Sequence, residues 1–214
     1  MLQPSTFISD GLLALVCAAC AVLALRQQSR QASDRQPLWF SVFLGFALTA
    51  SAATLGALRY GPGLDVAQAH SWLSQASSLL GLPLIALAAL VLGRRWTWEK
   101  SSWGRAVLGF CAFFELARQA GVMEHYRMVL NLLTLGLLLY ASALRWPEKR
   151  ALAYALSSVG LLALAGLWVG TRGTLGPFYS VDVFHALLIL AYPLILALLL
   201  RLSQVDATEL SPRG

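Results

Sequence analysis

The chain has 214 residues, of which 58% are hydrophobic and only 12% charged, and its mean hydropathy is +0.67. A soluble domain cannot bury so much apolar surface, because its exterior has to face water, so this composition excludes an ordinary soluble protein. The net charge of +6 does not indicate a nucleic-acid partner, since the basic residues lie in short segments between apolar stretches.

Seven apolar stretches follow one another along the chain, each close to the roughly 20 residues that a helix needs to cross a bilayer. They cover residues 7–25, 38–58, 71–92, 103–120, 124–144, 151–170 and 181–201, and the fourth is the least apolar. Their continuous apolar character lacks the alternation of a membrane β-barrel, and open strands cannot cross lipid. The sequence therefore predicts an all-α protein, a single seven-transmembrane-helix domain over residues 1–214.

The basic residues are unevenly divided between the two sets of connecting segments. Those expected on one side are Arg26, Arg30, Arg35, Arg94, Arg95, Lys100, Arg105, Arg145, Lys149, Arg150, Arg201 and Arg213. The other side has only Arg59, Arg118, Arg127 and Arg172. Because cytoplasmic loops are enriched in Lys and Arg, we expect the N-terminus outside, the C-terminus inside, and the chain in the inner (cell) membrane among its lipids.

All three histidines are predicted to lie on the non-cytoplasmic side. His70 precedes the third stretch, His125 begins the fifth, and His185 lies near the start of the seventh. Several acids accompany them, among them Asp10 in the first turn of the first stretch and Glu115 near the end of the fourth. Ionisable groups near membrane depth are costly, so they persist mainly when they are paired or have a function.

The pair Asp182 and His185 is the sharpest local pattern. At a spacing of three residues on a helix, both side chains share one face, so the carboxylate can orient the imidazole. Glu115 and Arg118 repeat this spacing, and there a simple ion pair that fastens the helix is the competing interpretation. Asp10 can equally cap its own helix or point into the bundle.

These residues lead to the hypothesis of a zinc site at the outer ends of the helices. Three histidines, His70, His125 and His185, are the candidate ligands, and a fourth position would stay open for water. In this hypothesis Asp182 orients His185, and Asp10 or Glu115 serves as a further ligand or as the general base. The predicted activity is hydrolysis of a lipid or amide at the outer membrane face. The segment 171–180 is expected to cover the site as a lid.

Two short motifs resemble those of known seven-span proteins. Ser9-Asp10-Gly-Leu-Leu-Ala-Leu in the first stretch and Asp182-Val-Phe-His185 in the seventh look like motifs of bacterial seven-span proteins distantly similar to the superfamily of alkaline ceramidases and progestin/adipoQ receptors. That resemblance implies seven helices, zinc held by three histidines with help from an Asp and a Ser, and lipid amides as substrates. The sequence departs from the pattern: a Ser-x-x-x-His motif is absent from the second stretch, and Ile189 replaces a second histidine in the seventh.

Two non-enzymatic alternatives stay open, a small-solute transporter and a binding or sensor subunit. Pro83 and Pro193 lie in similar strings 110 residues apart, which hints at the internal repeat of some transporters. A retinal protein is excluded, because Lys100 and Lys149 are the only lysines and neither is in the seventh stretch. Convergence of the histidines would favour the hydrolase, whereas polar groups that continue past mid-membrane would favour transport.

Overall fold

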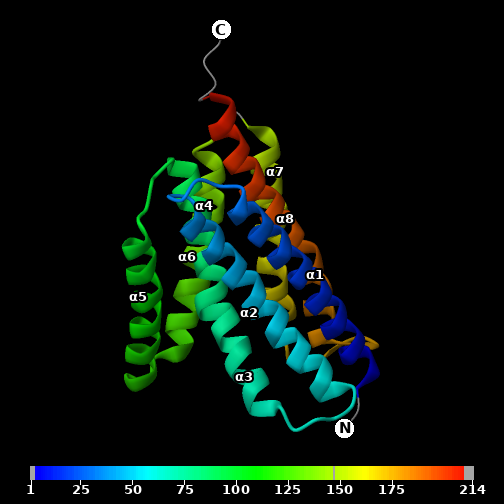
Figure 1. Ribbon diagram of the computed structural model, residues 1–214. Helices are drawn as coiled ribbons and strands as arrows, with labels where there is room; N and C mark the ends of the chain where they lie inside the picture. The colour runs from blue at the N-terminus through cyan, green and yellow to red at the C-terminus, as the bar shows by residue number, and fades with distance from the viewer. Residues whose placement is uncertain (1–2, 147, 210–214) are drawn as a thin grey trace.

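The computed structural model describes residues 3–146 and 148–209, with side chains as far as residue 204. The all-α prediction is confirmed (Figure 1). The helical elements are α1 (Pro4–Ser29), α2 (Gln36–Tyr60), α3 (Ala67–Ala76), η1 (Ser77–Gly81), α4 (Leu82–Arg94), α5 (Lys100–Gln119), α6 (Met123–Ala143), α7 (Lys149–Ala163), η2 (Leu164–Val169) and α8 (Ser180–Glu209). In α1 and α2 a proline stands in the first helical turn, where a missing N–H costs nothing.

Six helical stretches of the described chain are long and apolar enough to cross a membrane. They are Pro4–Ser29, Gln36–Tyr60, Ala67–Arg94, Met123–Ala143, Lys149–Val169 and Ser180–Gln204. Two of the six are composite, because α3, η1 and α4 follow one another without a break, as do α7 and η2. The residues predicted as a fourth stretch form α5, which is helical but contains Lys100, Arg105, Glu115 and Arg118. By length and apolar composition these six stretches are able to cross a membrane, and α5 is not among them.

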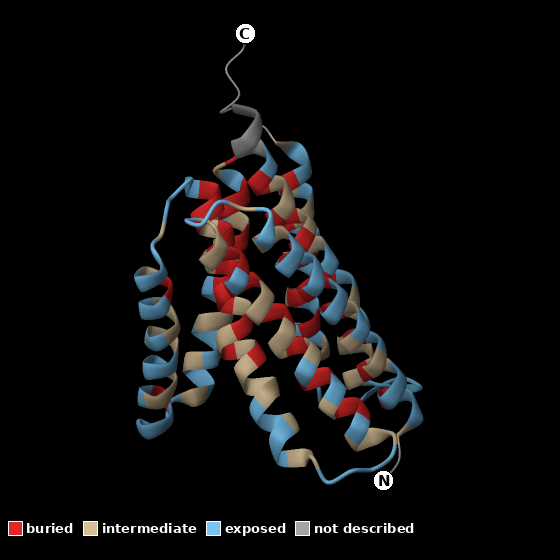
Figure 2. Ribbon diagram, in the orientation of Figure 1, coloured by how far each residue is buried: buried red, intermediate tan, exposed pale blue. Residues whose placement is uncertain are grey.

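The helices differ in how tightly they pack. The α1–α2 pair has the most extensive interface, α8 packs on α1 and α7, and α4 packs on α6. Large side chains such as Trp39, Phe46, Ile85 and Ile195 are fully buried in this bundle. In contrast, α5 stands to one side and makes few contacts (Figure 1), and most of its surface is exposed (Figure 2).

Glycines allow close helix contacts where lipid supplies no hydrophobic drive between helices. A Cβ at Gly45 of α2 would lie 2.6 Å from the carbonyl oxygen of Gly81. A Cβ at Gly93 of α4 would lie 2.7 Å from the carbonyl oxygen of Ala141 on α6. These two contacts hold α4 against its neighbours at both of its ends.

A π-helical turn, η1, precedes Pro83 in the third apolar stretch. Proline has no N–H, and its ring clashes with the carbonyl four residues earlier, so a helix widens or bends ahead of it. Ser77 begins this turn, and its side chain is buried. The widened turn therefore coincides with a polar side chain that points into the bundle.

The segment before α8 is a small antiparallel hairpin, in which β1 (Thr174–Leu175) pairs with β2 (Phe178–Tyr179). All four strand residues are exposed, and the amide of Ser180 donates to the carbonyl oxygen of Gly173 at 3.1 Å. The hairpin leads directly into the first turn of α8. Its predicted role as a lid stays a prediction.

Candidate functional site

Asp10 is the most deeply buried acid of the described chain, with only 1% of its surface exposed. It lies on the inner face of α1, which also carries buried Thr6, Leu13 and Cys17 at helical spacing. Gly56 of α2 faces it, and a Cβ at Gly56 would lie 2.4 Å from Asp10 Oδ2. The missing side chain of Gly56 is therefore what gives the Asp10 carboxylate its place between α1 and α2.

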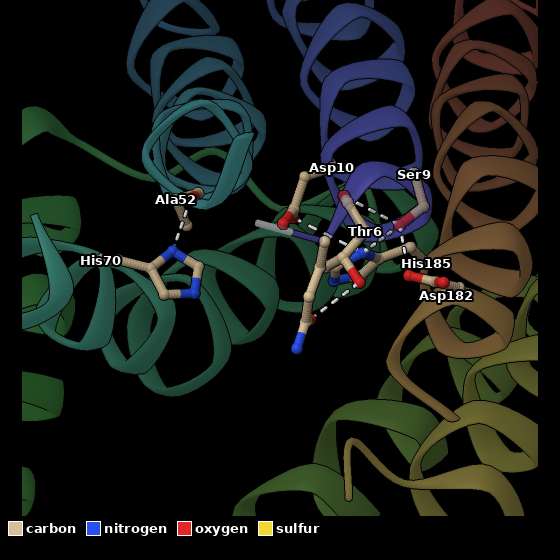
Figure 3. A network of polar contacts seen from close by, with 8 residues as sticks. Thr6, Ser9, Asp10, Ala52, His70, Asp182 and His185 are labelled. Carbon is tan, nitrogen blue, oxygen red and sulfur yellow. Dashed lines mark hydrogen bonds and ion pairs between the residues drawn. The ribbon is translucent and has the colours of Figure 1, made fainter. Parts of the chain in front are cut away.

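His185 approaches this carboxylate from the first turns of α8. Its Nδ1 lies 3.5 Å from Asp10 Oδ1 and 3.1 Å from Ser9 Oγ, and the histidine side chain is 11% exposed. Ser9 Oγ also lies 3.0 Å from Asp182 Oδ1. Figure 3 shows these four side chains converging from α1 and α8. We call Ser9, Asp10, Asp182 and His185 the outer cluster.

The hydrogen-bond network indicates which nitrogen of His185 carries a proton. Ser9 has one hydroxyl proton, and when it donates this proton to Asp182 it accepts from His185. Asp10 Oδ1, as a carboxylate oxygen, is also an acceptor for the same Nδ1. Both neighbours thus favour a proton on Nδ1, which leaves a lone pair on Nε2 for a proton or another electrophile.

His70 lies on α3 and is held in a similar way. Its Nδ1 is 2.9 Å from the carbonyl oxygen of Ala52 on α2, and a carbonyl can only accept, so this nitrogen carries the proton. Its ring also meets Tyr60 edge-on, with the centroids 6.4 Å apart. Figure 3 shows His70 in the same view as the outer cluster. Its hydrogen bond goes to Ala52 of α2 and not to a residue of the cluster.

The other predicted site residues lie elsewhere. The Glu115 side chain on α5 is 43% exposed, and its Oε1 lies 2.6 Å from Arg118 Nη2. The structure therefore shows the ion pair of the competing interpretation. Gln119 donates to the same carboxylate at 2.8 Å. His125 is exposed near the start of α6, an element that follows α5 on the far side of the bundle from α1 (Figure 1).

The predicted site residues therefore form two groups: those that lie close together in the structure and those that lie apart. Asp10, Asp182 and His185 come together, whereas Glu115 and His125 stay apart from them. Among the residues that the structure describes, no three His, Cys, Asp or Glu side chains form a group able to hold a metal ion. The zinc site with three histidines stays a prediction, and the geometry of the described residues does not assemble it.

Two residues of the site were not singled out for a role by reasoning from the residues themselves. Ser9, which links Asp182 to His185, appeared only within the resembling motif, and Gly56 was not named at all. The position of Ser9 directly before Asp10 is the one feature of the sequence that could have pointed to it. Gly56 gives no such signal, because its role depends on which helix packs against it.

A second polar group lies deeper in the bundle. Thr49 Oγ1 lies 2.7 Å from Ser77 Oγ and 3.3 Å from the hydroxyl oxygen of Tyr192, and it also donates to the Gly45 carbonyl at 3.2 Å. Each side chain comes from a different helical stretch, and all are buried. We call Thr49, Ser77 and Tyr192 the middle cluster.

The residues of the middle cluster lie two helical turns from residues in or near the outer cluster. Thr49 is seven residues from Gly56 on α2, Tyr192 is seven from His185 on α8, and Ser77 is seven from His70. Seven residues are about two helical turns, so each pair shares a helix face at two depths. Between them lie buried apolar side chains such as Leu13 and Ala53. The two clusters thus lie at two depths of the bundle and share one helix, α8.

Comparison with known proteins gives one match. No curated protein and no solved structure is similar to the chain. A family model described as a family of unknown function, DUF6962, matches residues 5–204, which includes the outer and the middle clusters. The match covers nearly the whole chain, and the protein therefore belongs to the DUF6962 family of unknown function.

Proposed function

We propose that the chain is an inner-membrane protein with seven crossings, its N-terminus outside and its C-terminus in the cytoplasm. The start of α1 and the end of α8 lie at opposite ends of the bundle (Figure 1), which supports an odd number of crossings. Six stretches are apolar enough, and α5 connects the end of α4 to the opposite end, where α6 begins. Twelve of the sixteen basic residues belong to the segments assigned to the cytoplasm, as the charge rule requires.

Reporter fusions test this topology. A cytoplasmic reporter fused after the α4–α5 segment near Thr97 and one fused after Gly121, between α5 and α6, differ only by α5. With seven crossings the first is active and the second is not. Equal activity of both fusions would mean that α5 does not cross.

Within that topology the outer cluster is the site of a membrane-embedded hydrolase that acts on an ester or amide bond of a lipid at the outer face. The single observation that carries this proposal is the contact of His185 Nδ1 with Asp10 and Ser9, which leaves Nε2 as a base. Kinship with the alkaline ceramidase superfamily is part of the proposal and adds lipid amides to the substrates to be tested.

The chemical steps follow from these contacts. His185 Nε2 takes a proton from a water molecule, whose oxygen attacks the substrate carbonyl. The Asp10 carboxylate stabilises the imidazolium that forms, because it lies 3.5 Å from Nδ1. Asp182, through the hydroxyl of Ser9, fixes the ring orientation. The imidazolium then returns its proton to the leaving amine or alcohol, and a carboxylic acid and the second product depart.

Zinc fits this site only in part. Asp10 Oδ2 is buried and has no hydrogen-bond partner among the described residues. In both His70 and His185 the Nδ1 atom faces an oxygen, as the second ring nitrogen of a metal-binding histidine usually does. The described residues nevertheless do not form a three-ligand group. No step above depends on a metal, and the metal content of protein purified without a histidine tag decides whether zinc belongs here.

An assay with matched variants tests the hydrolase. Purified protein in mild detergent is given N-acyl lipids and phospholipids, and release of free fatty acid is measured. Wild type and a His125→Gln variant should be active, whereas His185→Gln should not be. Activity that is unchanged in His185→Gln, or lost equally in His125→Gln, would contradict the assignment of the outer cluster as the site.

The middle cluster favours a second candidate, a binding or transport site for a small polar solute. Its hydroxyl groups lie two helical turns below the outer cluster and extend the polar groups toward mid-membrane. A solute flux into proteoliposomes that Thr49→Val abolishes, without any lipid hydrolysis, would favour this candidate over the hydrolase.

A further inference from the structure

The end of the bundle opposite the outer cluster has an unusual backbone at the end of α4. Arg95 has φ 57° and ψ 31°, and it is the one non-glycine residue with positive φ among those described. Its amide donates to the Leu92 carbonyl at 3.2 Å, and the amide of Trp96 donates to the Val91 carbonyl at 3.0 Å. These two hydrogen bonds define a Schellman motif, in which the left-handed residue is usually glycine.

An arginine at this position carries a conformational cost that glycine would avoid. The side chain therefore has to contribute something that glycine cannot. Arg94 precedes it, so two guanidinium groups begin the segment that connects α4 to α5. Both arginines are exposed.

Aromatic side chains surround Arg94. The Arg94 guanidinium lies over the Trp96 ring at 5.8 Å and over the Tyr140 ring at 5.2 Å, and it donates to the Tyr140 hydroxyl. Trp96 and Trp98 stack with an interplanar angle of 8°. Trp98 also contacts the buried ring of Trp103 on α5. Aromatic rings of this kind are typical of the level where a span meets the lipid headgroups.

A shallow cavity of about 470 Å³ opens on this segment, lined by Arg95, Trp96, Thr97 and Trp98. It combines a guanidinium, a hydroxyl and two indole rings. Guanidinium groups bind phosphate oxygens through paired hydrogen bonds, and indole rings pack against glycerol and acyl carbons. The acid in this segment, Glu99, accepts a hydrogen bond from Ser101 at 3.2 Å.

We propose that the α4–α5 segment, residues 94–98, is a binding site for the headgroup of an anionic phospholipid. Arg94 and Arg95 contact the phosphodiester, and Trp96 and Trp98 contact the glycerol and the first acyl carbons. A lipid is favoured over free phosphate because the site lies where the apolar stretch Ala67–Arg94 ends, at headgroup level. The site requires membrane insertion and is independent of the hydrolase activity.

Native mass spectrometry of the full chain in detergent tests the site, with phosphatidylglycerol and phosphatidylcholine as probes. Wild type should bind phosphatidylglycerol more tightly, and Arg94→Gln with Arg95→Gln should weaken this binding by about 10- to 30-fold, as expected for two arginines near a headgroup. Arg26→Gln with Arg30→Gln removes the same charge at the end of α1 and should leave the affinity within about 2-fold.

A second variant separates binding from folding. Arg95→Gly accepts the left-handed backbone without cost, so its melting temperature should equal or exceed that of wild type while its phosphatidylglycerol affinity falls. Equal binding of the two lipids by wild type, or an equal loss in the Arg26/Arg30 variant, would overturn the site. Full displacement of phosphatidylglycerol by millimolar inorganic phosphate would overturn the assignment to a lipid.

Discussion

The two polar clusters share one helix, α8, yet they differ in how their groups are satisfied. In the middle cluster the Thr49 hydroxyl has neutral partners on three sides: Gly45, Ser77 and Tyr192. In the outer cluster an acid is buried, and Asp10 Oδ2 has no hydrogen-bond partner among the described residues. A neutral, fully bonded group stabilises a helix interface, whereas a buried and incompletely bonded acid costs stability. This difference fits a structural role for the middle cluster and the functional role that we propose for the outer cluster.

The largest expected effect of this difference is on activity. His185→Gln keeps a polar side chain of similar size but removes the base, so hydrolysis should fall by about 10²- to 10⁴-fold. Thr49→Val at the middle level should leave the rate within about 3-fold, since a group bonded only to other helices does not affect the base. Fatty-acid release by the two purified variants provides the measurement. A rate that falls equally in both would remove the distinction between the clusters.

The next effect concerns the space that Gly56 leaves for Asp10. Gly56→Ala places a Cβ where the carboxylate now lies, and overpacking of this kind costs about 1–3 kcal/mol, partly offset by about 1 kcal/mol of helix propensity. We expect a lower melting temperature in detergent, together with a loss of activity.

A double mutant tests the cause of that loss. In an Asp10→Ala background the obstructing carboxylate is gone, so Gly56→Ala should no longer destabilise the protein. The same penalty in both backgrounds would mean that Gly56 matters for a different contact. Gly136, which has open space around it, provides the control, because Gly136→Ala should be neutral or stabilising.

A smaller effect is expected at the middle level. Thr49→Val removes the hydroxyl shared by Ser77 and Tyr192 while the shape is kept, and interhelical hydrogen bonds of this kind contribute about 0.6–2 kcal/mol in membranes. Denaturant unfolding in mild detergent should show a decrease within that range. Thr54→Val is the matched control, because Thr54 is exposed and bonds only to its own helix, so no measurable change is expected.

The helices were predictable from the sequence because lipid imposes a length and an apolar composition on every crossing. Each predicted stretch lies within one helix or one unbroken run of helices, to within one residue at either end. The π-turn at Ser77–Gly81 was not predicted, although Pro83, which follows it, is a residue that disturbs helices. The number and direction of crossings depend on α5, whose charged residues leave it below the apolarity of the other six.

The site was predictable only where its residues are neighbours on one helix. Asp182 and His185 share a face by spacing alone, and the structure brings them to one hydroxyl. Which distant residue meets them depends on packing: Asp10 comes into the cluster because α1 lies against α8, whereas His125 and Glu115 stay outside because α5 and α6 lie elsewhere. The outer location predicted for all of these residues does not determine where around the bundle each of them lies.

The smallest effect on stability is expected at Asp10 itself. Whether stability rises or falls there tests the difference between the outer and the middle cluster. Asp10→Asn keeps an oxygen for His185 Nδ1 and replaces a buried carboxylate by a neutral amide, which is cheaper to bury. The melting temperature should therefore stay equal or rise, by the equivalent of up to about 1 kcal/mol, while hydrolysis falls because the imidazolium loses its counter-charge. A residue kept only for packing would show the opposite pattern, with lower stability and unchanged rate. A stabilised but inactive Asp10→Asn protein would mean that the stability cost of this buried acid serves the chemistry of the outer cluster.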